Sequence, residues 1–155
     1  MRQVGLINPI MTLWQSGARG AGQKAELSAI EKLAAFDRKK YLSLETYRKN
    51  GQAVRTPVWF AAAPGPTLYV YTTAGSGKVK RLRRTGAVRI APCNMCGSVT
   101  GAWSNARASL VDGDAFVVGM RFLDHKYRPW KQIMDQAHRL FPRHRRVMIA
   151  IQPSL

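Results

Sequence analysis

Apolar residues recur with a helical period near the start of the chain and with a strand period through most of the remainder. Over about residues 24–39, side chains such as Leu27, Ile30 and Leu33 are spaced three to four positions apart. This spacing places them on one side of an α-helix and predicts a first amphipathic helix.

The period then changes to alternation. Residues 41–48, YLSLETYR, and residues 53–62 read as two strands, and Asn50-Gly51 between them tolerates the positive φ of a tight hairpin. Proline has no N–H for a strand ladder, so Pro57 marks a sheet edge, a bulge or a point where the backbone faces something else, such as a ligand.

Further short strands follow, separated by turn residues such as Pro64-Gly65-Pro66 and Asn94 to Gly97. They are predicted at residues 68–73, 87–93, 98–111 (with a bend near Gly101) and 146–152. With the first two, six strands joined by turns indicate a mainly β, α+β fold: an antiparallel barrel that is closed or nearly closed, with flanking helices.

Two helical segments are predicted within this barrel pattern. Residues 78–84 form a short basic helix that ends at Thr85-Gly86. A later helix is predicted to be capped by Asp114 and to continue over residues 127–141 after a break near Pro129. Its expected apolar face consists of Phe116, Val117, Met120 and Leu123.

The stretch LYVYTTAGSGKVKR, residues 68–81, joins an apolar strand to a cationic helix start. Gly75 and Gly77 allow successive N–H groups to turn toward one anion, and hydroxyls and basic side chains surround them. A helix N-terminus also favours negative charge, so the stretch suits a phosphate. The spacings of the P-loop and of GxGxxG are absent, and an ordinary solvated turn is an equally good interpretation of this stretch alone.

Composition and charge narrow the class of protein. A chain of 155 residues with 46% hydrophobic residues suits one globular domain; we assign residues 1–22, which have no sustained period, to a mobile N-terminal extension and residues 23–155 to the domain. The formal charge of +17 predicts attraction to polyanions. Because the basic residues are dispersed along the sequence, any nucleic-acid binding is expected to be weak, non-specific and salt-sensitive.

Neither a metal site nor a membrane segment is predicted. The pair Cys93 and Cys96 would supply half of a zinc site, and His125, His138 and His144 show no matching spacing, so two buried or half-buried thiols are expected. The apolar run near the N-terminus is interrupted and too short to span a membrane, so we expect a cytoplasmic protein.

The runs TPVWF, T-x-x-x-S-G-K-x-x-R and APC occur in a familiar order and separation. Over about residues 41–111 the chain resembles the pyridoxamine 5′-phosphate oxidase-like split β-barrel superfamily, and most closely its coenzyme F420-dependent oxidoreductases. The HKYRPW segment at residues 125–130 is similar to the C-terminal helix of that family.

This resemblance implies an FMN-binding type of six-stranded split barrel and a homodimer with two cofactor sites at the subunit interface. The cofactor would be coenzyme F420 or FMN, which the motif does not separate. The resemblance implies that the cofactor ring lies along Arg55, Thr56, Pro57, Val58 and Trp59, and that its phosphate is held by Thr72, Thr73, Ser76, Gly77, Lys78 and Arg81.

The chain contains no evident nucleophile, base and acid arrangement, as expected if a cofactor carries the chemistry. Two hypotheses therefore stand: an oxidoreductase acting on a small unsaturated organic substrate, or a non-enzymatic flavin- or polyanion-binding barrel. Four aromatic side chains are candidates to line a substrate pocket: Tyr47, Trp59, Tyr71 and Trp103. Core packing is the commoner role for such residues.

Overall fold

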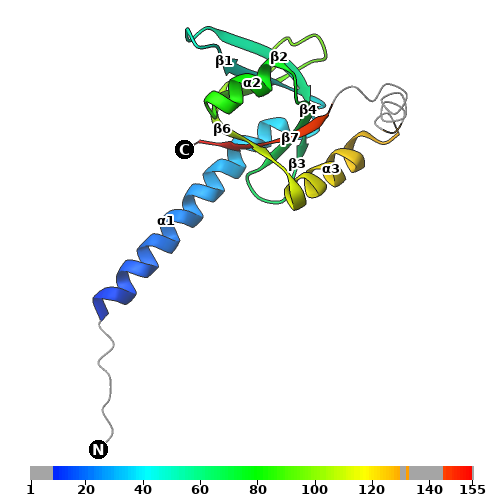
Figure 1. The fold of residues 1–155 in the computed structure, drawn as a ribbon. Helices are drawn as coiled ribbons and strands as arrows, with labels where there is room; N and C mark the ends of the chain where they lie inside the picture. Colours follow the sequence, from blue (N-terminus) through cyan, green and yellow to red (C-terminus); the bar gives the residue numbers. More distant parts are fainter. Residues whose placement is uncertain (1–8, 130–131, 133–144, 155) are drawn as a thin grey trace, which may run out of the picture.

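The computed structural model describes residues 9–129, 132 and 145–154, and Figure 1 shows a barrel of strands with α3 beside it and the first helix projecting away. Within the first helix, side chains are described from Gly20 onward. The elements are α1 (Pro9–Leu33), the 3₁₀ turn η1 (Ala34–Phe36), β1 (Tyr41–Tyr47), β2 (Ala53–Trp59), β3 (Ala61–Ala62), β4 (Leu68–Thr73), α2 (Gly77–Arg84), β5 (Ala87–Cys93), β6 (Ser104–Val111), α3 (Gly113–Tyr127) and β7 (Arg146–Pro153).

The strands form one sheet in the order β2-β1-β5-β6-β7-β4-β3, with every pair of neighbours antiparallel. The two strands at the ends of this order, β2 and β3, are consecutive in the chain and are separated only by Phe60. The sheet therefore closes on itself through one interrupted strand. The predicted antiparallel barrel with flanking helices is confirmed, and the predicted strand over residues 53–62 is divided in two.

The turns form where glycine, asparagine and proline predict them. Gly51 has φ 81°, and the amide of Arg48 donates to the carbonyl of Gln52 at 2.9 Å, which closes the β1–β2 hairpin. Gly65 has φ 88° in the turn between β3 and β4. β5 has the predicted bounds, and α2 begins one residue earlier than predicted. These turns set the register of the strands around the barrel.

The first helix differs from the prediction at both ends. It begins at Pro9 rather than near Lys24, and it ends at Leu33, where η1 leads to Arg38 in the left-handed region (φ 58°). Leu27 is 55% exposed and Ile30 is 42% exposed, although the spacing predicts a buried face. Among its described side chains, the buried ones, Ala29 and Leu33, lie near its C-terminal end, so the apolar pattern is a poor guide to its length.

Two further boundaries were predicted wrongly. The strand expected from residue 98 begins at Ser104, because only an isolated bridge at Val99 joins the preceding segment to β5. The N-cap of α3 is Asp112 rather than Asp114, and its side chain makes no capping hydrogen bond. Val117 is 50% exposed, so it lies off the packed face of α3. That helix ends at Tyr127, before Pro129 as predicted; most of the predicted continuation lies outside the described residues.

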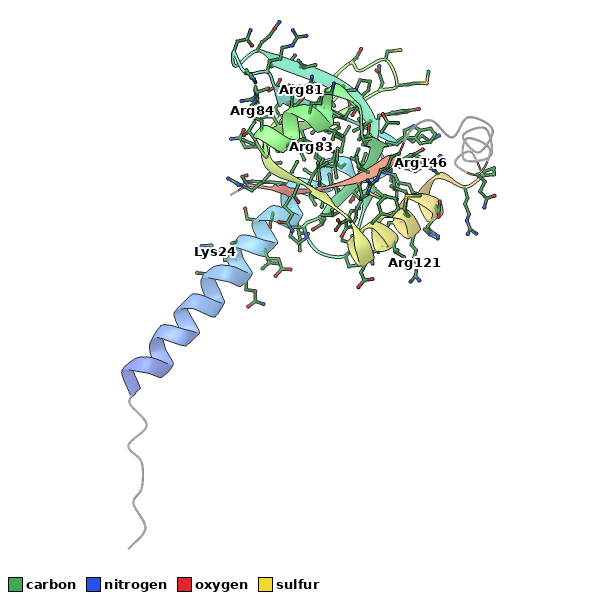
Figure 2. The ribbon with its side chains drawn as sticks, in the orientation of Figure 1. Lys24, Arg81, Arg83, Arg84, Arg121 and Arg146 are labelled. Carbon is green, nitrogen blue, oxygen red and sulfur yellow. The ribbon has the colours of Figure 1, made fainter. Side chains whose placement is uncertain are left out.

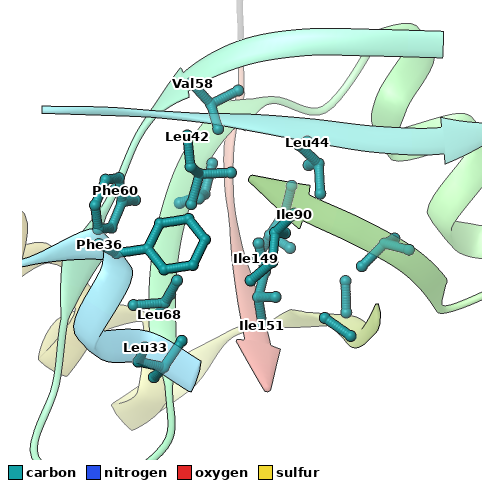
Figure 3. Close-up of a cluster of buried hydrophobic side chains, with 14 of the residues drawn as sticks. Leu33, Phe36, Leu42, Leu44, Val58, Phe60, Leu68, Ile90, Ile149 and Ile151 are labelled. Carbon is teal, nitrogen blue, oxygen red and sulfur yellow. The ribbon is translucent and has the colours of Figure 1, made fainter. Parts of the chain in front are cut away.

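The apolar core is divided into two clusters by the wall of the barrel. Figure 3 shows the cluster inside the barrel, where Leu33 and Phe36 close one side. Inward residues of the strands and Leu82 of α2 make up the rest of the cluster. The second cluster lies between the outside of the sheet and α3, and its fully buried members include Leu123 and Met148. Trp59 and Tyr71 pack at the margin of this second cluster. No helix among the described residues is both long and apolar enough to cross a membrane.

Candidate cofactor cleft

A gap opens between β2 and β4 where pairing stops at the end of β3. Ala61 pairs with Tyr69, and continuing the same register would place Trp59 opposite Tyr71 and Pro57 opposite Thr73. Those pairs do not form; instead β2 pairs only with β1, and β4 pairs with β7 on its other edge. Proline cannot donate to a ladder, so Pro57 suits this open edge, as predicted.

The gap is a cleft of about 300 Å³. Unpaired strand edges present backbone N–H and C=O groups along it, and side chains from four strands and α2 line it. The lining residues are Tyr41, Pro57, Val58, Trp59, Tyr71, Thr72, Thr73, Lys78 and Arg146. Two cations and two threonine hydroxyls line the same space, and no carboxylate is among the described residues of the lining.

The first turn of α2 brings its lysine to the end of β4. Lys78 Nζ donates to Thr72 Oγ1 at 3.3 Å, and the hydroxyl oxygens of Thr72 and Ser76 lie 3.5 Å apart. Burial lowers the pKa of Lys78, and the charge of Arg81 lowers it further. Ser76 occupies the N-cap position, yet its side chain makes no capping bond. Its hydroxyl therefore remains directed at the threonine rather than at the helix N–H groups.

The aromatic wall of the cleft is supported from behind by α3. The rings of Trp59 and Tyr127 are stacked, with centroids 4.8 Å apart and planes 12° apart. The Tyr127 hydroxyl accepts from the Phe60 amide at 3.0 Å and lies 2.7 Å from the Phe60 carbonyl and 2.6 Å from that of Lys40, to one of which it donates. Burial raises the pKa of Tyr127, so this hydroxyl stays protonated. One side chain thus holds both the indole and the barrel seam at Phe60.

No protein-family model and no curated protein matches the sequence. Solved structures do match. HutZ, the heme storage protein from Vibrio cholerae, superposes with a TM-score of 0.62 over 81% of this chain and 89% of its own, at 16% identity. A Clostridium acetobutylicum protein of the pyridoxinephosphate oxidase family, related to general stress protein 26, gives 0.54 over 83% and 84%, at 13% identity. A protein named F420 reductase gives 0.51 over 79% and 93%, at 20% identity.

The chain has the pyridoxamine 5′-phosphate oxidase-like split-barrel fold. At these identities the matches establish the fold and leave the activity open, since the proteins that share this split barrel include both a reductase and a heme storage protein.

The split barrel gathers about half of the predicted cofactor residues in the cleft. The lining contains Pro57, Val58, Trp59, Thr72, Thr73 and Lys78. Ser76 adjoins it through Thr72. The residues outside the lining are Arg55, Thr56, Gly77 and Arg81.

Two of those outside the lining make other contacts. Arg55 Nε pairs with Glu45 Oε2 at 2.8 Å, and its guanidinium lies 4.8 Å from the centre of the Trp103 ring. Burial raises the pKa of Glu45, but hydrogen bonds from Arg55 and Tyr47 and the charge of Arg89 outweigh it, so this pKa lies below its ordinary value. Arg81 Nε donates to Thr46 Oγ1 at 2.7 Å, on the other side of α2.

Tyr41 and Arg146 line the cleft and were not predicted. Tyr41 pairs with Trp59 in the β1–β2 hairpin. The predicted Asn50-Gly51 turn sets this pairing, so the sequence did contain a signal for Tyr41. Arg146 pairs with Thr73 across β4 and β7, two strands far apart in the sequence. Its guanidinium lies 5.4 Å from the centre of the Tyr71 ring. No local pattern predicts that pairing.

Other candidates lie away from the cleft. Of the four aromatic side chains considered for a pocket, Trp59 and Tyr71 line it; the Tyr47 hydroxyl donates to Glu45 at 2.8 Å, and Trp103 lies against Arg55. Cys93 is buried, where burial raises its pKa, whereas Cys96 is exposed rather than half-buried. Within the described part of the chain, no three His, Cys, Asp or Glu side chains gather as a metal site would require.

Proposed function

We propose that the cleft binds FMN or coenzyme F420 and that the protein is an oxidoreductase, which transfers a hydride between this cofactor and a small unsaturated organic substrate. The observation that carries the proposal is that one cleft combines the Trp59 wall with the donors Thr72 and Lys78, and that no carboxylate is among its described lining residues. Proteins of the same fold named F420 reductase and pyridoxinephosphate oxidase family support it.

The donor set fits a phosphate. Charged phosphate oxygens only accept hydrogen bonds, and the ammonium of Lys78 and the hydroxyls of Thr72 and Thr73 are donors that line the cleft, with Lys78 and Thr72 in contact. The N-terminus of α2 begins beside them and adds a favourable dipole. A volume of about 300 Å³ is at the lower end for ligand sites.

The role of the chain's own residues would be to bind and orient. The stacking of Trp59 on Tyr127 holds the indole in one orientation, so a planar ring lying along Pro57 to Trp59 would meet a rigid surface. The cofactor, when bound, supplies the hydride chemistry. The protein then neutralises the phosphate, fixes the ring and excludes water from the open edge of β2.

The small volume and open edge of the cleft agree with a homodimer, in which a second protomer would cover the cleft. An isologous interface would cover both copies of the cleft at once. Sedimentation at micromolar concentration is expected to report a dimer; a monomer under all conditions, with cofactor present or absent, would contradict this part of the proposal.

The test is a fluorescence titration of wild type and Lys78→Ala with FMN and with coenzyme F420. Loss of a charged hydrogen bond costs roughly 1.5–3 kcal/mol, so Lys78→Ala is expected to weaken binding by about ten- to a hundredfold. Lys80→Ala is the matched control, because Lys80 lies on the same helix and outside the cleft lining. The proposal would be contradicted if Lys78→Ala bound every cofactor that wild type binds with the same affinity as wild type.

The alternative is a non-enzymatic flavin- or polyanion-binding barrel. The heme storage protein HutZ, which has the same fold, supports this alternative. The two functions differ in turnover. A storage protein would bind the cofactor at the cleft, yet the bound reduced cofactor would persist when unsaturated substrates are added. Oxidation of bound reduced cofactor on addition of a substrate, followed by its absorbance, would favour the enzyme.

A further inference from the structure

Another concave surface lies on the other side of α2, and every side chain that lines it among the described residues is cationic. We call it the basic groove. It has a volume of about 520 Å³ and lies between the β1–β2 turn and the helix. Its lining consists of Arg48, Lys49, Gly77, Lys80, Arg81, Arg83 and Arg84. Two basic residues from the hairpin therefore join four from the helix.

The fold holds this cluster together against mutual repulsion. Val79 and Leu82 are buried and attach α2 to the barrel, so the polar side of the helix must face outward. Arg81 donates to Thr46 Oγ1, and Arg84 donates to the carbonyl of Tyr47, so two guanidiniums are fixed against β1. The remaining basic side chains of the groove are exposed. The positions of the cations are thus set by packing and by hydrogen bonds to β1.

Within the part of the chain that the structure describes, no acidic side chain lines the groove. The nearby acidic side chain of β1, Glu45, is engaged by Arg55 at 2.8 Å and Arg89 at 3.4 Å. Burial lowers the pKa of Arg81, and the charge of Arg48 lowers it further. Like charges held together destabilise a protein, and an anionic ligand would relieve that repulsion.

The chemistry of the lining restricts the ligand. Among the described residues of the lining, no aromatic side chain is present on which a base would stack, and no side chain can accept a hydrogen bond from the amino group of adenine or cytosine. Four of the six cations are arginines, whose planar guanidinium matches phosphate oxygens in pairs. The long-range attraction of a chain with formal charge +17 is strongest for a ligand of high linear charge density.

We propose that the basic groove binds the phosphate backbone of nucleic acid without reading its bases. This function is separate from the cleft, because Lys78 faces the cleft and Lys80 and Arg83 face the groove. The basic groove would then be the surface responsible for the weak, non-specific nucleic-acid binding that the composition predicts.

The test is fluorescence anisotropy with two labelled DNA duplexes of unrelated sequence and a labelled single strand, with salt varied from about 50 to about 200 mM. Wild type is compared with Lys80→Gln/Arg83→Gln and with the control Lys24→Gln/Arg121→Gln. Both double variants lower the net charge equally. Figure 2 shows Lys24 on α1 and Arg121 on α3, away from Arg83 and Arg84 on α2.

We expect the groove variant to bind both duplexes about tenfold more weakly and to lower the slope of affinity against salt by about two, while the control keeps most of its affinity. Equal losses in the two variants would mean that overall charge binds DNA, and would overturn the proposal. So would a strong preference for one sequence.

Two competition arms separate the phosphate backbone from other anions. The proposal would also be overturned if wild type bound inorganic polyphosphate or polyaspartate and did not bind DNA. FMN and F420 affinity should be the same in the groove variant and in wild type. If cofactor affinity falls as much as DNA affinity, the groove belongs to the cofactor site and the proposal fails, whereas failure of Lys78→Ala to affect cofactor binding would leave the groove result standing.

Discussion

The cleft and the basic groove lie on two sides of one short helix, α2, and they are made in different ways. The cleft is part of the barrel: its walls are the edges of β2 and β4, and its indole is held by a tyrosine from α3. The groove is a surface of exposed cations over an apolar attachment. Lys78 and Lys80 are two positions apart, about 200° around a helix, and so serve different sites.

One helix therefore borders two surfaces that are built in different ways. A site built into the core has few conformations and can orient a planar ring, but changes in it alter the stability of the fold. A site built from exposed side chains can adjust to the phosphates of a flexible ligand, and substitutions in it leave the fold intact. If the cleft depends on the barrel in this way, substitutions that weaken the barrel near the cleft should lower the free energy of unfolding.

The largest effect is expected at the seam between β2 and β3. Phe60 is 1% exposed and packs edge-on against Phe36, with ring centroids 5.8 Å apart. Phe60→Ala should lower the free energy of unfolding by about 3–5 kcal/mol, because it leaves a cavity where the barrel closes. Urea unfolding followed by circular dichroism measures this. Val117→Ala, at a 50% exposed position, should change it by less than about 0.5 kcal/mol.

Removal of one hydroxyl at the same seam should have a smaller effect. Tyr127→Phe leaves the amide and a carbonyl of the backbone near Phe60 without their partner, so the free energy of unfolding should fall by about 1–3 kcal/mol. The stacking on Trp59 is retained. Tyr69→Phe is the control, since no hydrogen bond of that hydroxyl is found among the described residues. Equal stability of the two variants would show that the seam does not depend on this bond.

Ser76→Ala separates cofactor binding from helix capping. Loss of a neutral hydrogen bond to a phosphate, roughly 1 kcal/mol, should weaken FMN or F420 binding about fivefold. An N-cap serine normally adds about 1 kcal/mol of stability, but Ser76 makes no capping bond here, so the melting temperature should not change. A lower melting temperature with unchanged cofactor affinity would reverse this assignment.

The smallest effect concerns pH. Lys126 Nζ lies 3.5 Å from the centre of the Phe60 ring, and burial lowers its pKa from 10.5 to about 8. Between these two values the unfolded chain binds more protons, so stability rises with pH there. The group is partly exposed and screened, so the gain over Lys126→Met should be at most about 1 kcal/mol. Urea unfolding at about pH 7 and about pH 10.5 measures it; a constant difference between the two proteins would contradict it.

Local sequence patterns determined most of the elements and half of the cleft. The strand predicted at residues 41–48, the Asn50-Gly51 turn and the bounds of β5 depend on neighbours in the chain, and the structure contains all three, with β1 ending at Tyr47. The hydroxyls, glycines and lysine after β4 are contiguous, so their proximity also follows from the sequence. The predicted roles of these residues in cofactor binding remain predictions.

Only the tertiary structure decided which distant segments meet. Arg146 reaches the cleft because β7 pairs with β4, and Arg48 joins the α2 arginines because the hairpin folds over that helix. Residues 80–84 supply four of the six cations of the groove from one local run, and the fold adds Arg48 and Lys49. The extent of α1 was likewise missed, because its N-terminal part has no apolar period. Barrel closure relates residues by register around the whole sheet, and local periodicity carries no information about that register.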